Sequence, residues 1–217
     1  MNQFLESARA MKDELVKIRR DIHQNPEVGD HLPQTTKYVM ERLKEFGYDP
    51  KEICDSGIVA LVGKSNSNKT FMLRADMDAL PIEEQTDYSF KATNGNMHAC
   101  GHDMHTASLL GCAKILSTIK DKFTGTVMLI FQPSEEMYPG GAYMMMQDGV
   151  FDQVMPNEIF AFHCLPEMDS GSIGMKKGKY MASTDELYLT VKGRGGHGGT
   201  PNLNIDPIVI ASHIIVA

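Results

Sequence analysis

The first apolar residues of the chain recur at helical spacing. Four of them step by four, three and four residues: Met11, Leu15, Ile18 and Ile22. This spacing places them on one face of a helix, and Asn25-Pro26 is expected to end it, because the residue before a proline disfavours helical backbone. A second amphipathic pattern over residues 34–46 predicts another helix, which stops at Gly47.

Short apolar runs then alternate with helical patterns. Strands are predicted over residues 58–62, 70–75, 125–131 and 158–162, and helices over residues 106–119 and 141–148. The run GTVMLIF at 125–131 is almost entirely apolar, which is typical of a strand buried on both faces of a sheet, and we expect the same burial for 158–162. The alternation indicates an α/β fold with an open, mostly parallel sheet flanked by helices.

The pattern changes near residue 178. Residues 187–191 alternate apolar and polar, as a half-exposed antiparallel strand does, and residues 193–201 are rich in glycine. Asp206 and Pro207 are good start signals for a helix that runs to the chain end without a stop signal. We therefore predict an α/β domain over residues 1–178 and the start of a second, α+β domain over residues 179–217, cut off at the chain end.

Composition and charge exclude several classes of protein. The 217 residues are 42% hydrophobic and 23% charged, with a net charge of −7. The sequence shows no basic patch of the kind that binds nucleic acid, and no apolar run near the roughly 18 residues of a membrane helix. Without a basic patch or a membrane helix, we expect no nucleic-acid or membrane partner. The four cysteines lack the spacing of a disulfide framework, so we expect a reducing, cytoplasmic setting.

The strongest chemical signal is the octapeptide HACGHDMH at residues 98–105. It contains three of the eight histidines and one of the four cysteines. Imidazole and thiolate are ligands that divalent metals such as zinc prefer. Cys100 and His102 lie too close together for a zinc finger, and they suit a site whose other ligands come from elsewhere in the chain.

Polar clusters also follow three of the predicted strands. Residues 74–78 (RADMD) end the strand at 70–75, Ser134-Glu135-Glu136 follows the strand at 125–131, and His163-Cys164 follows the strand at 158–162. In open α/β sheets, sites form beyond the carboxyl ends of the strands. We therefore expect these clusters to converge with Cys100 and His102 at one edge of the sheet.

The two adjacent glutamates suit metal-assisted hydrolysis. Their side chains point in different directions, so one can bind a metal while the other takes a proton from water. We assign Glu136 as the metal ligand and Glu135 as the general base; the alternative is a solvated charge pair. His163 is interpreted as a further ligand, and its alternative is a structural histidine.

Four more side chains near these positions have open roles. Asp76 and Asp78 are ligands, carboxylates that orient a ligating histidine, or caps of the following turn. Asp103 either bridges two metals or caps the following helix, and His105 is an orienting or structural residue. The remaining cysteines are interpreted as ordinary thiols: Cys54, Cys112 and Cys164.

Five motifs in order along the chain point to one family. They are RRDIHQNPE (19–27), RADMDALP (74–81), HACGHDMH (98–105), FQPSEE (131–136) and GRGGHGGTP (193–201). Together they resemble the metal-dependent N-acyl-amino-acid amidohydrolases. This is the branch with hippurate hydrolase and the auxin-conjugate hydrolases, within the aminoacylase superfamily of two-metal exopeptidases. The resemblance runs the whole length of the chain.

The resemblance implies a catalytic metal-binding domain with an inserted lid domain through which two subunits form a homodimer. It implies that Glu135 is the catalytic base and that His197 reaches the partner subunit's site, where it stabilises the oxyanion. The reaction would be hydrolysis of the amide bond of a small N-acyl amino acid to a carboxylic acid and a free amino acid. One or two divalent ions (zinc, manganese, cobalt or nickel) would be held by the implied ligands: Cys100, His102, Glu136 and His163.

Two alternatives remain beside this hydrolase. Family members are nearly twice as long as this chain, and a further metal-binding histidine is expected beyond Ala217. The first alternative is therefore a non-catalytic, truncated homologue that binds metal or a partner without turnover. The second is a structural Cys/His zinc module, which would need two more ligands near His105.

Overall fold

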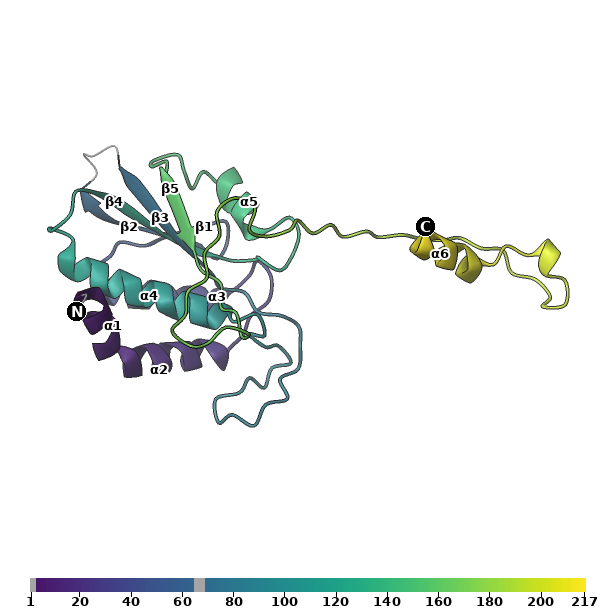
Figure 1. Cartoon of the computed structure of the whole chain (residues 1–217), viewed down its shortest axis with the longest axis horizontal. Helices are drawn as coiled ribbons and strands as arrows, with labels where there is room; N and C mark the ends of the chain where they lie inside the picture. The colour runs from purple at the N-terminus through teal and green to yellow at the C-terminus, as the bar shows by residue number, and fades with distance from the viewer. Residues whose placement is uncertain (1–2, 65–68) are drawn as a thin grey trace. The chain divides into compact units, whose positions relative to one another are not determined.

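The computed structural model describes residues 3–64 and 69–217, and these fall into two units. The first unit ends at Glu167 and contains the whole sheet, and the second runs from Met168 to Ala217 (Figure 1). The assignment of residues 1–178 and 179–217 to two domains of a larger fold stays a prediction.

A five-stranded sheet with the order β1-β2-β4-β3-β5 forms the centre of the first unit. The strands are β1 (Lys51–Ile53), β2 (Gly57–Lys64), β3 (Thr70–Asp76), β4 (Gly125–Gln132) and β5 (Glu158–Ala161). β3 runs parallel to both β4 and β5, whereas β2 runs antiparallel to β1 and β4. In the β3–β4 register, Asp76 pairs with Gln132, so the carboxyl ends of these two strands lie side by side.

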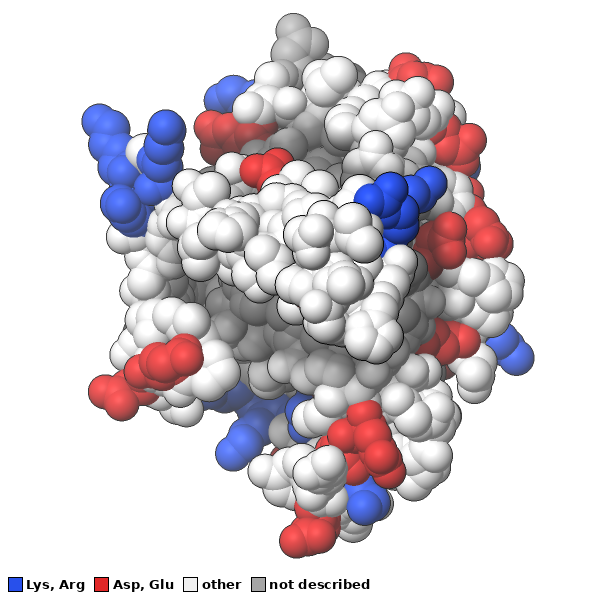
Figure 2. All heavy atoms as spheres, turned by 90° about the vertical axis from the view of Figure 1, so that its right-hand side faces the viewer, with Lys and Arg blue, Asp and Glu red and all other residues white. Residues whose placement is uncertain are grey.

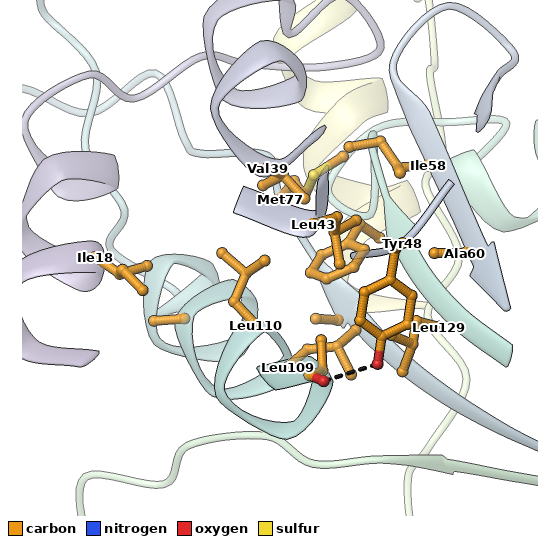
Figure 3. Packing of buried hydrophobic residues seen from close by; sticks show 14 of the residues in the cluster. Ile18, Val39, Leu43, Tyr48, Ile58, Ala60, Met77, Leu109, Leu110 and Leu129 are labelled. Atoms are coloured by element: carbon orange, nitrogen blue, oxygen red, sulfur yellow. Dashed lines mark hydrogen bonds between the residues drawn. The ribbon is translucent and has the colours of Figure 1, made fainter. Parts of the chain in front are cut away.

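Four helices lie together below the sheet in Figure 1, and the main core forms between them and the sheet. They are α1 (Gln3–Ala10), α2 (Lys12–His23), α3 (Pro33–Glu45) and α4 (His102–Ile119). Ile18, Leu43 and Leu110 from these helices belong to the same buried cluster as Leu129 of β4 (Figure 3). The Tyr48 hydroxyl donates to the carbonyl oxygen of Ala113 at 2.7 Å, which ties the end of α3 to α4 within this core.

A smaller core lies on the opposite face of the sheet. Because side chains alternate along a strand, Leu129 and Phe131 of β4 face the main core while Met128 and Ile130 face the smaller one. Met145 of α5 (Gly141–Gln147) covers this second face. The predicted α/β fold with helices flanking a sheet is therefore confirmed, with the parallel pairing confined to β3, β4 and β5.

Two predicted strands differ from the structure. β5 forms, but all four of its side chains are exposed rather than buried. It is the edge strand of the sheet in the described part of the chain and pairs with β3 on one side. Residues 187–191 form no strand; they are largely exposed, and among the described residues no strand pairs with them. Alternation predicts a strand only where a partner completes its hydrogen bonds.

The second unit contains the 3-10 turn η1 (Pro201–Leu203) and helix α6 (Pro207–Val216). The predicted start signal is confirmed, because the Asp206 carboxylate accepts from the backbone N–H of Ile208 at 2.8 Å and Pro207 is the first helical residue. Among the described residues, no helix is both long and apolar enough to cross a membrane. In the view of Figure 2, acidic and basic side chains are interspersed with broad uncharged areas.

Candidate metal centre

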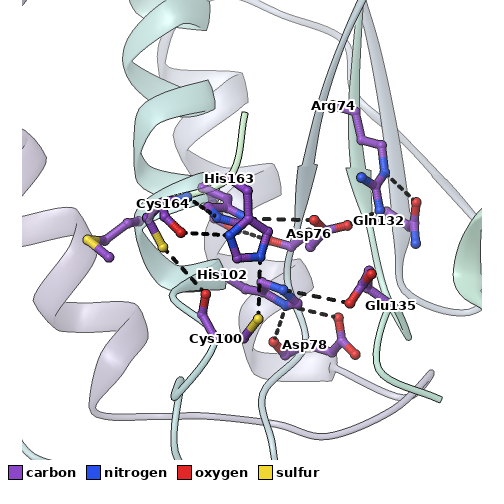
Figure 4. A network of polar contacts seen from close by, with 12 residues as sticks. Arg74, Asp76, Asp78, Cys100, His102, Gln132, Glu135, His163 and Cys164 are labelled. Carbon is purple, nitrogen blue, oxygen red and sulfur yellow. Dashed lines mark hydrogen bonds and ion pairs between the residues drawn. The ribbon is translucent and has the colours of Figure 1, made fainter. Parts of the chain in front are cut away.

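The polar clusters predicted to converge lie together beyond the carboxyl ends of β3, β4 and β5 (Figure 4). The loop before α4 supplies Cys100, and His102 is the first residue of that helix. The turn after β4 supplies Glu135, and the segment after β5 supplies His163. Parallel strands end at one edge of a sheet, and this shared edge brings together residues that are far apart in the sequence.

Cys100, His102 and His163 form the centre of the cluster. Their ligand atoms all lie within 4.8 Å of one another. Cys100 Sγ lies 3.4 Å from His163 Nε2. His163 Nδ1 lies 2.8 Å from the carbonyl oxygen of Cys164, which can only accept a hydrogen bond, so Nδ1 carries the proton. His163 therefore turns an unprotonated Nε2, the form that binds a metal, toward Cys100.

His102 is held in the same tautomer by a different partner. Its Nδ1 lies 2.9 Å from the backbone carbonyl oxygen of Asp78 and therefore donates. Its Nε2 is buried, and within residues 3–64 and 69–217 it has no hydrogen-bond partner. This nitrogen lies 3.9 Å from both Glu135 Oε2 and Glu136 Oε1.

Glu136 is oriented by its backbone. Its N–H donates to Asp78 Oδ2 at 3.0 Å, so Asp78 contacts both His102 and Glu136. The left-handed backbone of Ser134 (φ 50°) turns the chain directly after β4. Glu136 Oε1 is buried and lacks a hydrogen-bond partner in the described part of the chain.

The unpartnered atoms show that these residues fit a divalent cation. Buried polar atoms in proteins are normally satisfied, yet His102 Nε2 and Glu136 Oε1 face each other without a donor between them. A nitrogen lone pair and a carboxylate oxygen beside a thiol make up the donor set that zinc and related ions bind.

The pKa values of the cluster reflect anionic groups gathered in a partly buried place. Burial and the neighbouring Glu136 raise the pKa of Cys100 to about 12. Burial, with the carboxylates of Asp76 and Glu136, raises the pKa of Glu135. For His102, burial acts to lower the pKa, but the hydrogen bond to Asp78 and the charge of Asp76 outweigh it and raise the pKa.

Asp76 and His105 adjoin the centre. Asp76 forms an ion pair with Arg74 and lies 3.5 Å from His105 Nδ1. Asp76, His102 and His105 also bring their ligand atoms within 4.8 Å of one another. These contacts leave all three roles considered for Asp76, as a ligand, an orienting carboxylate or a cap of the following turn, as predictions.

Asp103 is not part of the ligand groups in the described structure, and both roles considered for it, bridging two metals or capping α4, stay predictions. Its Oδ2 lies 2.7 Å from His23 Nδ1 and 2.7 Å from Arg19 Nε. Its other oxygen accepts from the N–H of the adjacent Met104, while Gly101 occupies the N-cap position of α4. The opposite charges supplied by α2 therefore pair with this buried carboxylate.

The sequence predicts an ordinary thiol at Cys164, and the structure places this thiol beside the centre. Its ligand atom and those of His105 and His163 lie within 4.8 Å of one another. The only sequence signal for this was its position next to His163. His197, by contrast, belongs to the second unit, where its Nδ1 accepts from the N–H of Gly199 at 3.1 Å; its role in the site stays a prediction.

Comparison with known proteins identifies relatives. Residues 72–212 match the model of peptidase family M20/M25/M40. The chain is 46% identical to hippurate hydrolase of Campylobacter jejuni, an alignment that covers 95% of this chain and 54% of the relative. It is 37% identical to N-acyl-L-amino acid amidohydrolase of Geobacillus stearothermophilus, covering 94% of this chain and 55% of that protein.

A solved structure is similar as well. The crystal structure of the Bacillus subtilis YXEP protein, a dinuclear metal-binding peptidase from the M20 family, matches with a TM-score of 0.72 at 38% identity. That match covers 78% of this chain and 48% of the other. The chain spans about half the length of the curated relatives that it matches.

Proposed function

The chain belongs to peptidase family M20/M25/M40, and on this premise we propose that it forms the metal-binding part of a hydrolase for N-acyl amino acids. The reaction cleaves the amide bond and releases a carboxylic acid and a free amino acid. Support for the substrate class comes from two relatives, whose names are hippurate hydrolase and N-acyl-L-amino acid amidohydrolase.

One or two divalent cations, of zinc, manganese, cobalt or nickel, are held in this proposal by Cys100, His102, Glu136 and His163. The observation that carries it is the pair of buried, unpartnered atoms His102 Nε2 and Glu136 Oε1, 3.9 Å apart in the described structure. The name of the YXEP protein, a dinuclear metal-binding peptidase, supports two ions. A bound divalent cation supplies positive charge that polarises an amide carbonyl and lowers the pKa of a nearby water.

Glu135 acts as the general base. Its side chain is 41% exposed, so a water can reach it, and its Oε2 lies at the edge of the proposed ligand set. The raised pKa of Glu135 makes it a stronger proton acceptor. Glu135 takes a proton from the attacking water and returns it to the leaving amine nitrogen, so the carboxylate is regenerated after each turnover.

The second unit contributes His197 to the partner subunit of a homodimer. The histidine lies in a glycine-rich segment at residues 193–201 and is exposed, so it is accessible to another molecule. There it donates a hydrogen bond to the oxyanion that forms when water adds to the amide carbonyl. Residues 179–217 then form the beginning of the lid domain. The reducing, cytoplasmic setting also stays a prediction.

Turnover of a panel of N-acyl amino acids by the 217-residue chain tests this function. Where the wild-type chain releases free amino acid, Glu135→Gln should lower kcat by at least about a hundredfold while cation binding is kept. Glu52→Gln, which changes an exposed glutamate on β1, is the matched control and should leave kcat unchanged.

Other results would change the assignment. Near-wild-type turnover by Glu135→Gln would contradict its role as the base. A wild-type chain that binds cations and releases no amino acid would instead support the alternative of a non-catalytic, metal-binding homologue.

A further inference from the structure

We propose that a buried charged network of Arg19, His23, Glu84 and Asp103 is a positioning device that fixes the loop carrying Cys100 and the start of α4 carrying His102. Among the described residues, none of these four side chains belongs to the groups that could hold the proposed cation, although Asp103 directly follows His102 in the sequence. The inference concerns how the ligands are held, and its consequence for cation affinity rests on the proposed function.

The network is centred on one histidine between two carboxylates. His23, at the end of α2, places Nδ1 2.7 Å from Asp103 Oδ2 and Nε2 3.1 Å from Glu84 Oε1. The side chains of His23, Glu84 and Asp103 are at most 3% exposed. Ionised carboxylates only accept hydrogen bonds, so both ring nitrogens donate and the imidazole is positively charged. Arg19 adds a second positive charge beside Asp103.

Each carboxylate is tied to a different part of the ligand-bearing segment. Asp103 is adjacent to His102 in the first turn of α4. Glu84 accepts from the backbone N–H of Ala92 at 2.7 Å and from the Thr86 hydroxyl at 2.5 Å. His23 therefore joins the start of α4 to the loop between β3 and α4 at a single point.

This loop needs such an anchor. Residues 77–101 form no helix or strand, and their regular pairing in the described structure is limited to bridges such as Leu80 with Met97. Long irregular segments are costly to order, yet Cys100 at the end of this one must be placed accurately to bind a cation. The Asn94 side chain also donates to the carbonyl oxygen of Pro26 at 2.9 Å, which attaches the same loop to the residues after α2.

Stability alone does not account for a buried charged network at this place. The desolvation of buried ions offsets much of their attraction, so apolar side chains of similar volume often stabilise a fold as well or better. The second ion pair between α2 and α4, Glu14 with Lys114 at 2.6 Å, is partly exposed and lies away from the ligand loop. The two pairs thus join the same helices, but only the buried one adjoins the proposed ligands.

The test compares variants of the 217-residue chain by two readouts. One is the dissociation constant for Zn²⁺, measured by competition with a chromophoric chelator. The other is the rate of amide hydrogen exchange of residues 98–105 in the cation-free chain. His23→Gln should weaken Zn²⁺ binding by about ten- to a hundredfold, as substitutions behind metal ligands do, and should speed exchange in residues 98–105.

Lys114→Met is the matched control, because it breaks the other ion pair between the same two helices. It should lower overall stability without changing either readout at the site. Arg19→Met provides a milder disruption in case His23→Gln does not fold, and Arg19→Lys, which keeps the charge beside Asp103, should restore most of the affinity that Arg19→Met loses.

The outcomes separate this inference from the proposed function. Wild-type affinity and wild-type exchange in both His23→Gln and Arg19→Met would overturn the positioning role, as would equal changes in Lys114→Met. If the wild-type chain binds no Zn²⁺, the proposed cation site is wrong. The exchange rates of residues 98–105 still decide whether the network positions this segment.

Discussion

The imidazole of His102 and the backbone of Asp78 are joined by a 2.9 Å hydrogen bond from Nδ1 to the carbonyl oxygen. This bond fixes which ring nitrogen faces the carboxylates of Glu135 and Glu136. The side chain of the same aspartate accepts from the N–H of Glu136 at 3.0 Å. Asp78 therefore contacts two of the proposed ligands, His102 through its backbone and Glu136 through its side chain.

The side-chain contact predicts that Asp78→Ala, which keeps the carbonyl oxygen bonded to His102 but removes the carboxylate bonded to Glu136, weakens cation binding by about tenfold, as removing a partner behind a metal ligand does. Asp78→Asn keeps an oxygen that can accept from the N–H of Glu136 and should weaken cation binding less than Asp78→Ala. Competition titration with Zn²⁺ measures both. Equal affinities for Asp78→Ala and the wild-type chain would show that the Asp78 carboxylate does not orient Glu136 for cation binding.

Cation binding should strengthen as pH rises. The cation needs the thiolate of Cys100 and the neutral form of His102, and the pKa values of both groups are raised in the cation-free chain. Each proton that must be displaced changes the apparent affinity by about tenfold per pH unit. Titrations with Zn²⁺ at about pH 6, 7 and 8 should therefore give an increase of at least about tenfold per unit; an affinity that does not vary with pH would contradict these ligands.

The stability of the cation-free chain should carry a second pH signature, from His23 and Glu84. The hydrogen bond to Asp103 raises the pKa of His23 despite its burial. The contribution of His23 to the free energy of unfolding is therefore complete below its ordinary pKa of 6.5. This contribution is lost as pH rises through the raised pKa of the folded state. Burial acts to raise the pKa of Glu84, but hydrogen bonds from Thr86, Ala92 and His23 outweigh it and lower the pKa.

Glu84 consequently contributes to the free energy of unfolding above its ordinary pKa of 4.5. This contribution is lost as pH falls through the lowered pKa of the folded state. Thermal unfolding in a chelator should show the largest difference in Tm between the wild-type chain and His23→Gln between pH 4.5 and 6.5. The difference should shrink above this range. A difference that grows steadily toward alkaline pH would contradict a charged His23.

Gly101 should tolerate alanine less well than Gly95. Both glycines have a φ of 83°, so each substitution costs about 1–2 kcal/mol from the left-handed backbone. A Cβ at Gly101 would also clash with Cys164 Sγ, whereas one at Gly95 meets nothing within 4 Å in the described structure. Denaturant unfolding should show that Gly101→Ala lowers the free energy of unfolding more than Gly95→Ala does. The difference between the two substitutions should shrink when Cys164 is also replaced by alanine. Equal losses for the two glycines would show that Cys164 does not crowd Gly101.

The convergence of the site could be anticipated from sequence because strand ends determine it. The apolar run of β4 and the position of Glu135 after it are enough to place that residue at the carboxyl edge of the sheet. The roles of individual carboxylates were harder to predict. Asp103 stands beside His102 in the sequence, but its partners, Arg19 and His23, come from α2 and can be identified only in the folded chain.

Other features depend on tertiary partners that no local pattern reveals. The apolar residues of β5 predict burial, but the strand lies at the edge of the sheet in the described chain, with its side chains exposed.

His98 is buried, and neither of its ring nitrogens has a hydrogen-bond partner in the part of the chain that the structure covers. Burial lowers its pKa to about 4, so it is neutral at pH 7.

The number of metal ions per chain tests the central claim most directly. Elemental mass spectrometry of the purified, gel-filtered 217-residue chain should find one to two divalent ions per chain. It should find the same number in Cys112→Ala, which alters an exposed thiol on α4, and none in the double variant Cys100→Ala/Glu136→Ala. A folded wild-type chain without metal would contradict the claim that these residues form a metal centre by themselves, and a double variant that keeps the wild-type metal content would contradict their assignment as ligands.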